Sequence, residues 1–197
     1  ESEEIGTVGV GEATTPAIHF FNSRVGVDQA DFMRTCQATF KLGVEFVDWG
    51  DIGRRYIHPF TPFGRDLNNV FFHELWLKYA ELKAAQGETL SIDDYNLCSV
   101  AAQHNRFSHP VGGARGFVAP LNYAFHFDAS LYAKYLRKLS EQRGVVRLEG
   151  KIVDIQQESE TGVLQALVLD DGRKIEGDLF FDGTGQRAIL IEQTLKT

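Results

Sequence analysis

The stretch Phe125–Gly144, FHFDASLYAKYLRKLSEQRG, shows most plainly how the chain folds. Asp128 occupies an N-cap position, and Phe127 and Tyr132 flank it as a hydrophobic staple. An apolar stripe with helical spacing follows, and it consists of Leu131, Tyr135 and Leu139. Gly144 is a typical stop signal. The sequence therefore predicts a helix that begins after Asp128 and ends before Gly144.

The residues after this helix have the pattern of β-strands. Strand-like runs occupy residues 145–150, 151–157, 163–169 and 173–182. The dipeptide Asp171-Gly172 between two of them is a hairpin signal. This end of the chain is therefore expected to be rich in β-structure.

Two further helices are predicted before this region. One begins after the N-cap Asp28 and places Phe32, Cys36 and Phe40 on one face. The other runs from about residue 72 to 86, with Glu74 and Lys78 spaced as an i,i+4 ion pair. Helices and strands alternate without an internal repeat, so the predicted fold class is α/β, or mixed α+β.

The composition is that of a globular protein. The chain has 197 residues, of which 43% are hydrophobic, and a net charge of −7 from 20 basic and 27 acidic side chains. This acidic balance argues against a nucleic-acid or anionic-membrane surface. No apolar run approaches the ~20 residues of a membrane span, and no signal peptide is visible.

The spacing of the cysteines and histidines argues against a disulfide framework and against a metal site. Cys36 and Cys98 are far apart and form no CxxC motif, which disfavours a disulfide framework and favours a reducing, cytoplasmic setting. The six histidines show neither HxxxH nor HxH spacing, so no metal site is expected.

Two glycine-rich turns are candidates for cofactor binding. The run Gly9–Thr14, GVGEAT, fails as a dinucleotide fingerprint because Thr14 replaces the third glycine and Pro16 follows. The run Asp182–Gly185, DGTG, follows an apolar segment and permits close approach of the backbone to a ligand. It is equally compatible with a strand-to-helix turn capped by Thr184.

Lys41 lies between the apolar Phe40 and the run LGVEFV. A lysine desolvated by such neighbours can act as a nucleophile or a hydrogen-bond donor. Alternatively, it caps the end of the preceding helix or extends to solvent. Nearby, His58-Pro59-Phe60 pairs an imidazole with an aromatic ring, which suits the wall of an aromatic-ligand site.

Several of these runs together resemble the flavin-dependent tryptophan halogenases. GVGEATTP (9–16) resembles the family's strap between flavin and substrate, and ATFKLGVEFVDW (38–49) resembles the segment that carries its essential lysine. His58-Pro59-Phe60 falls where the family has His-x-Phe beside its substrate. FHFDA (125–129) and DLFFDGTG (178–185) match in order and spacing.

The resemblance implies a partial FAD-binding, Rossmann-like domain and a halogenation reaction. Reduced FAD, O2 and chloride or bromide would generate hypohalous acid, which Lys41 would direct onto tryptophan or another indole. The resemblance also implies a separate flavin reductase. His58 and Phe60 would wall the aromatic substrate. The implied flavin-binding residues are Glu1, Ser2, Ile5, Glu12, Ala13, Val153 and Gly185.

The family's N-terminal GxGxxG and C-terminal WxWxIP motifs are missing, so the chain is expected to be an internal part of a larger enzyme. The expected regions are a strap and lysine region (1–60), a substrate-side helical region (61–143) and a β-rich flavin-binding return (144–197). Two alternatives stay open: a flavin monooxygenase or oxidoreductase, and a non-catalytic flavin-binding scaffold.

Overall fold

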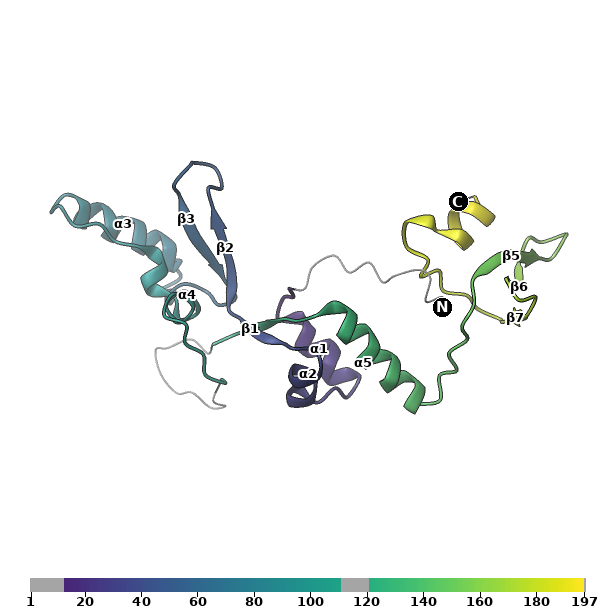
Figure 1. The fold of residues 1–197 in the computed structure, drawn as a ribbon. Coiled ribbons are helices and arrows are strands. Elements are labelled where there is room, and N and C mark those ends of the chain that lie inside the picture. Colours follow the sequence, from purple (N-terminus) through teal and green to yellow (C-terminus); the bar gives the residue numbers. More distant parts are fainter. Residues whose placement is uncertain (1–12, 111–120, 197) are drawn as a thin grey trace. The chain divides into compact units, whose positions relative to one another are not determined.

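The computed structural model describes residues 13–110 and 121–196 (Figure 1). These residues form two compact units, one of residues 13–138 and one of residues 139–196. The helices of the larger unit are α1 (Ala17–Arg24), α2 (Gln29–Thr35), α3 (Phe72–Ala84), the 3-10 helix η1 (Ile92–Tyr95), α4 (Leu97–Gln103) and α5 (Ala129–Gln142). Helix α5 continues beyond residue 138, where the larger unit ends. Its strands are β1 (Thr39–Lys41), β2 (Gly43–Val47), β3 (Arg55–Pro59) and β4 (Ala124–His126).

The smaller unit contains the strands β5 (Ile152–Gln157), β6 (Leu164–Leu169) and β7 (Lys174–Glu176). Two short helical segments follow, the 3-10 helix η2 (Gly185–Arg187) and the π-helix η3 (Ile189–Thr194). Every strand pairing among residues 13–110 and 121–196 is antiparallel. The predicted mixture of helix and strand is confirmed.

Aromatic rings form the core of the larger unit. Phe32, Cys36 and Phe125 are almost completely buried, and Phe127 is 8% exposed. The Phe32 ring meets the rings of Phe125, Phe127 and Tyr132 edge to face, with centroids 5.2–5.3 Å apart. Figure 1 shows α1, α2 and the start of α5 gathered around β1. Edge-to-face packing adds to the stabilisation that these rings provide by burial.

Local capping signals place the two helices that support this core. The Asp31 amide donates to Asp28 Oδ1 at 2.8 Å, and the Leu131 amide donates to Asp128 Oδ1 at 2.9 Å. Phe127 and Tyr132 pack with ring centroids 4.9 Å apart. The predicted N-termini of α2 and α5 and the staple of α5 are therefore confirmed.

The predicted placement of Phe40 on the face of α2 is wrong. The helix ends at Thr35, and Gln37 follows in the left-handed region with φ 54°. Phe40 instead lies in β1, opposite Phe125 of β4. Lys41 is therefore a strand residue, and the interpretation that it caps a helix C-terminus is wrong as well.

The hairpin β2–β3 follows β1 directly. Gly43 pairs with Pro59, and a Cβ atom at Gly43 would lie 2.6 Å from the His58 carbonyl oxygen, so the close approach of the strands requires glycine. Farther along the chain, α3 ends at Ala84, two residues before the predicted end. Lys78 pairs with Glu81 at 2.8 Å, so the expected Glu74 pair is wrong.

The smaller unit contains a three-stranded antiparallel meander in the order β5-β6-β7. The predicted turn at Asp171-Gly172 is confirmed, since Gly172 has φ 85° and its amide donates to Leu169 O at 2.9 Å. Residues 145–150 and 178–182 are not strands, contrary to the prediction. Their apolar pattern is suited to a strand, but a strand also needs a partner, which a local pattern does not supply.

Within residues 13–110 and 121–196, no helix combines the length and apolar character needed to span a membrane.

Candidate active site around Lys41

Lys41 is a buried lysine that is held at both ends of its side chain. Its backbone belongs to β1, and the residue is 9% exposed. The ammonium nitrogen Nζ donates a hydrogen bond to the Thr14 carbonyl oxygen at 2.9 Å. The same nitrogen lies 5.4 Å from the centre of the Phe60 ring, a cation–π distance. The ammonium group is thus fixed between a carbonyl dipole and an aromatic face.

The register of β1 and β4 explains this position. Lys41 stands directly opposite Ala124, which is fully buried and has only a methyl group. Thr14 lies along the other edge of β4, where its amide donates to Phe125 O at 3.0 Å. Lys41 can therefore cross β4 above Ala124 to reach the Thr14 carbonyl. A larger residue at position 124 would occupy that path.

Thr14 is itself held firmly. Its Oγ1 hydroxyl donates to Phe125 O at 3.0 Å, and the Phe125 amide lies 3.2 Å from the same Oγ1. The adjacent Ala13 forms an antiparallel bridge with His126. The backbone carbonyl that binds Lys41 is consequently part of the β-structure.

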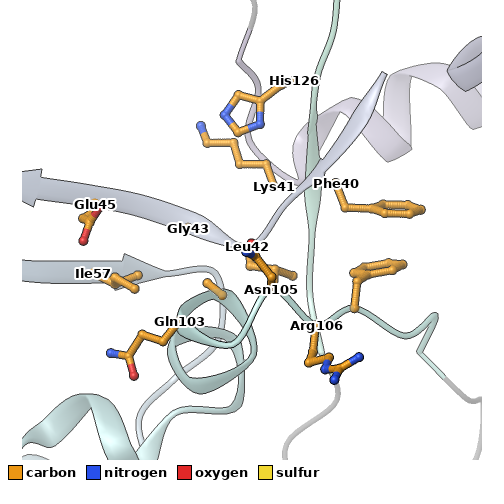
Figure 2. A pocket seen from close by; sticks show the side chains of 12 residues that line it. Phe40, Lys41, Leu42, Gly43, Glu45, Ile57, Gln103, Asn105, Arg106 and His126 are labelled. Carbon is orange, nitrogen blue, oxygen red and sulfur yellow. The ribbon is translucent and has the colours of Figure 1, made fainter. Parts of the chain in front are cut away.

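A cavity of about 500 Å³ opens beside Lys41 (Figure 2). Phe40 and Phe107 form one side, with their rings stacked 3.6 Å apart at an interplanar angle of 11°. Its titratable and charged lining residues are Lys41, Glu45, Arg106 and His126. The cavity thus joins an aromatic wall to groups that can donate or accept protons, which suits chemistry on an aromatic ring.

His126 lies on the same face of the β1–β4 ladder as Lys41. It pairs with Thr39, two residues before Lys41, so the two side chains are diagonal neighbours. Partial burial, followed by the positive charge of Lys41, lowers the pKa of His126 below its ordinary value of 6.5. At neutral pH, His126 is therefore an uncharged imidazole that can accept a proton.

The two predicted substrate-wall residues are placed differently. Phe60 is half-buried, and its ring lies beside Lys41. Its amide donates to Leu42 O at 3.1 Å, which continues the β2–β3 pairing. His58 pairs with Val44 and is exposed, and neither His58 nor Phe60 is among the residues that line the cavity. The structure therefore brings Phe60, but not His58, to Lys41.

The predicted flavin residues are divided among several places. Glu1, Ser2, Ile5 and Glu12 lie outside the described residues. Ala13 belongs to the larger unit, whereas Val153 and Gly185 belong to the smaller one. Val153 lies on β5 and is 59% exposed, and Gly185 begins η2 with φ 67°. The exposed residue Val153 and the Gly185 turn are accessible within their own unit.

The Asp182–Gly185 turn is a capped turn with open space at Gly183. The Asp182 carboxylate accepts from the amides of Thr184, Leu190 and Ile191 at 2.8–3.1 Å. Its hydrogen bond from the Thr184 hydroxyl is the main cause that lowers the pKa of Asp182 to about 2. The carboxylate thus caps η3, while Gly183 has no atom within 4 Å of its Cβ position. A flavin could approach the main chain there, so the turn fits the group implied by the resemblance.

The sequence did not single out Thr14, Glu45, Arg106 or His126 as site residues. Their proximity to Lys41 depends on strand pairing between distant segments, and no local pattern reports it. Among the described residues, no cluster of three His, Cys, Asp or Glu side chains could hold a metal ion.

Comparisons with known proteins identify the family of the chain. The family described as tryptophan halogenase matches residues 1–197. A flavin-dependent halogenase from Xanthomonas campestris is 48% identical over 98% of this chain and 37% of its own, with a TM-score of 0.86. The flavin-dependent halogenase BrvH from Brevundimonas sp. BAL3 is 37% identical over 95% of this chain and 37% of its own, also with a TM-score of 0.86.

Curated relatives give the same result. The tryptophan 7-halogenase RebH of Lentzea aerocolonigenes is 30% identical over 100% of this chain and 38% of its own length. The 7-chloro-L-tryptophan 6-halogenase KtzR of Kutzneria sp. is 30% identical over 99% of this chain and 40% of its own. The chain thus spans about two fifths of these relatives. Its fold is that of the FAD-binding, Rossmann-like flavin-dependent halogenases. Because the family match covers all 197 residues, the chain belongs to the tryptophan halogenase family.

Proposed function

We propose that the protein containing this chain halogenates an aromatic substrate, tryptophan or another indole. The reaction would consume reduced FAD, O2 and chloride or bromide, with a separate flavin reductase supplying the reduced cofactor. The observation that carries the proposal is the fixed ammonium group of Lys41, anchored on Thr14 O beside an aromatic cavity.

Lys41 would direct the oxidant. One of its three N–H donors is engaged by Thr14 O, which leaves the others available to bind the oxygen of hypohalous acid. The electrophilic halogen would then form a bond to one ring carbon as its bond to oxygen breaks. The departing hydroxide would take up a proton, and water would leave. Holding both reactants in place selects which ring carbon reacts.

Aromatic side chains would bind the substrate. Phe60 lies against the Lys41 nitrogen, while Phe40, the neighbour of Lys41 on β1, points to the opposite face of the strand and stacks on Phe107 at the cavity. Their π-faces favour a planar indole in offset or edge-to-face packing. His58, exposed on β3, would join this wall only where the substrate extends beyond the cavity.

Bound reduced flavin would supply the two-electron activation of O2 that converts halide to hypohalous acid. The residues proposed to hold it are Glu1, Ser2, Ile5, Glu12, Ala13, Val153 and Gly185. We propose the same three regions as above: strap and lysine (1–60), substrate side (61–143) and flavin-binding return (144–197). The open space at Gly183 supports the flavin-binding role of residues 144–197.

The first test is product analysis with Lys41 variants. The intact protein should be incubated with FAD, a flavin reductase, NADH, bromide and either tryptophan or indole, and the products identified by mass spectrometry. Lys41→Ala and Lys41→Met should lower bromination by at least about 100-fold, since loss of a positioned donor removes roughly 3 kcal/mol of transition-state stabilisation. FAD binding, measured by fluorescence quenching, should persist.

An exposed lysine on α5 provides the matched control. Lys134→Ala removes the same charge elsewhere in the larger unit and should retain bromination. Bromination by Lys41→Met at the wild-type rate would contradict the proposed role of Lys41. A wild-type protein that only hydroxylates the indole would instead be a flavin monooxygenase, and one that binds flavin without any product would be a scaffold.

A further inference from the structure

The cavity beside Lys41 holds a second proton-transfer group that the proposed mechanism does not use. The same face of the β1–β4 ladder carries Lys41, Thr39 and His126, because alternate residues of paired strands point to one side. Diagonal neighbours on such a face are within reach of long side chains. Figure 2 shows the Lys41 side chain extending toward the imidazole of His126.

We infer that His126 is a positioning residue that takes a proton from the Lys41 ammonium as Lys41 reacts in the cavity. This inference rests on the proposed function of Lys41. Two features of the fold support it: β-sheet register fixes both side chains, and the bridge between Ala13 and His126 ties this position to the segment that binds the Lys41 ammonium.

The proton transfer gives Lys41 a second route, which runs through its free amine instead of its ammonium group. The Lys41 ammonium gives one proton to the neutral imidazole, and the electron pair of that N–H bond stays on Nζ. The free amine attacks the halogen of hypohalous acid, so that an N–halogen bond forms and the O–halogen bond breaks. The amine proton and the departing hydroxide leave as water. The halogen then passes to a ring carbon as the N–halogen bond breaks and its electron pair stays on Nζ. The proton that this carbon loses and the proton held by His126 both return to Nζ, which restores the ammonium group.

The charges around His126 are compatible with this role. Partial burial, and after it the field of the Lys41 cation on β1, lowers the pKa of His126. Glu45 on β2 and Arg106, which follows α4, also line the cavity and bring opposite charges. Asp128 on the same segment is engaged at the N-terminus of α5 through the Leu131 amide. A neutral His126 therefore adds no second positive charge beside Lys41.

The first experiment needs no activity. The histidines of the intact protein should be labelled with ¹³C, and the His126 signal, assigned by its loss in His126→Ala, titrated by NMR. We expect a pKa below 6.5 in the wild type and a rise toward 6.5 in Lys41→Met, which removes the neighbouring charge. Arg106→Gln is the control and should leave the value unchanged. An unchanged value in Lys41→Met, or an equal rise in both variants, would overturn the inference.

The second experiment measures bromination against pH. In the wild type, kcat should fall as pH decreases through the His126 pKa, because the imidazolium can no longer accept a proton. His126→Ala should lose that acid limb and about 100-fold in kcat at pH 7, with KM changed less than twofold and partial recovery in added imidazole. His73→Ala, an exposed histidine on α3, is the matched control.

The two proposals fail in different ways. Absence of bromination by the wild-type protein would count against the proposed function, while the NMR titration would still decide the coupling of Lys41 and His126. Wild-type bromination together with an unaltered pH profile in His126→Ala would overturn the inference and leave the proposed function standing.

Discussion

At the scale of single residues, the small side chain opposite Lys41 leaves room for the lysine to reach Thr14. Ala124 is fully buried and stands opposite Lys41 in the β1–β4 register. We predict that Ala124→Val blocks the path of the lysine to Thr14 O. The free energy of unfolding should fall by about 1–3 kcal/mol through overpacking, and bromination should fall by at least tenfold. Urea denaturation and product analysis measure the two effects separately.

A second buried alanine separates loss of stability from displacement of the lysine. Ala166 on β6 is 3% exposed and belongs to the smaller unit. Ala166→Val should destabilise the protein by a similar amount while retaining more bromination activity. Equal activity losses in the two variants at equal stability would contradict the role assigned to Ala124.

The sequence predicts the central residue of the site but not its surroundings. The resemblance predicts Lys41 as the functional lysine, and Phe60 lies beside it. The contacts with Thr14 and His126, by contrast, join segments that are remote in the sequence, and only the pairing of β1, β4 and the Ala13–Thr14 segment brings them together. Side-chain periodicity within one strand does not reveal which strand is its partner.

At the scale of elements, the N-terminus of α4 is held by one buried amide. Asn96 is 2% exposed, and its Nδ2 donates to the carbonyl oxygens of Thr61 and Pro62 at 2.8 and 3.0 Å. Its Oδ1 accepts from the Ser99 amide at 3.0 Å. Asn96 thus caps the helix and fixes the loop that follows Phe60.

We predict that Asn96→Ala lowers the free energy of unfolding by about 3 kcal/mol, the sum of a lost cap and of buried carbonyls left unpaired. The measurement is urea denaturation followed by the fluorescence of Trp49 and Trp76. Ser91→Ala, which removes the exposed cap of η1, should cost less than about 1 kcal/mol. Equal losses of unfolding free energy in Asn96→Ala and Ser91→Ala would show that burial of Asn96 does not strengthen its cap.

Elements set by local chemistry were predictable, whereas elements set by distant partners were not. The caps at Asp28 and Asp128 and the turn at Asp171-Gly172 act within a few residues, and each was confirmed. The prediction that Phe40 lies on the same helix face as Phe32 was wrong, because α2 ends at Thr35 and Phe40 pairs with β4. Residues 178–182 have an apolar strand pattern, but the Asp182 carboxylate caps η3 instead. Tertiary pairing overrides local propensity in both places.

At the scale of the whole molecule, the titratable groups should destabilise the larger unit at high pH and the smaller unit at low pH. In the larger unit, burial and the nearby Asp128 and Asp31 carboxylates raise the pKa of Cys36 from 9.0 to about 11. Burial raises the pKa of Tyr132 from 10.0 to about 12. In the smaller unit, Asp182 has its pKa lowered from 3.8 to about 2. An acidic group whose pKa is raised by folding lowers the free energy of unfolding as pH rises. One whose pKa is lowered by folding does so as pH falls.

We therefore predict that the larger unit loses stability between about pH 9 and pH 11, where an unfolded Cys36 releases its proton and the folded one keeps it. The loss attributable to Cys36 is roughly 2 kcal/mol, and the urea midpoint of Trp49 and Trp76 fluorescence should fall accordingly. Cys36→Ala removes this titration and should flatten the decline, with Tyr132 accounting for what remains. A decline of the same steepness in Cys36→Ala would contradict the assignment.

The smaller unit should weaken at the other end of the pH range. The Asp182 charge stabilises the turn fully above about pH 4 and is lost as pH falls through about 2, since protonation ends the acceptance of hydrogen bonds from Thr184, Leu190 and Ile191. Hydrogen-exchange mass spectrometry of peptides covering η3 should show protection factors that decrease over this interval. Asp182→Asn should show the low protection already at pH 5. Protection that is independent of both pH and this substitution would show that another contact holds η3.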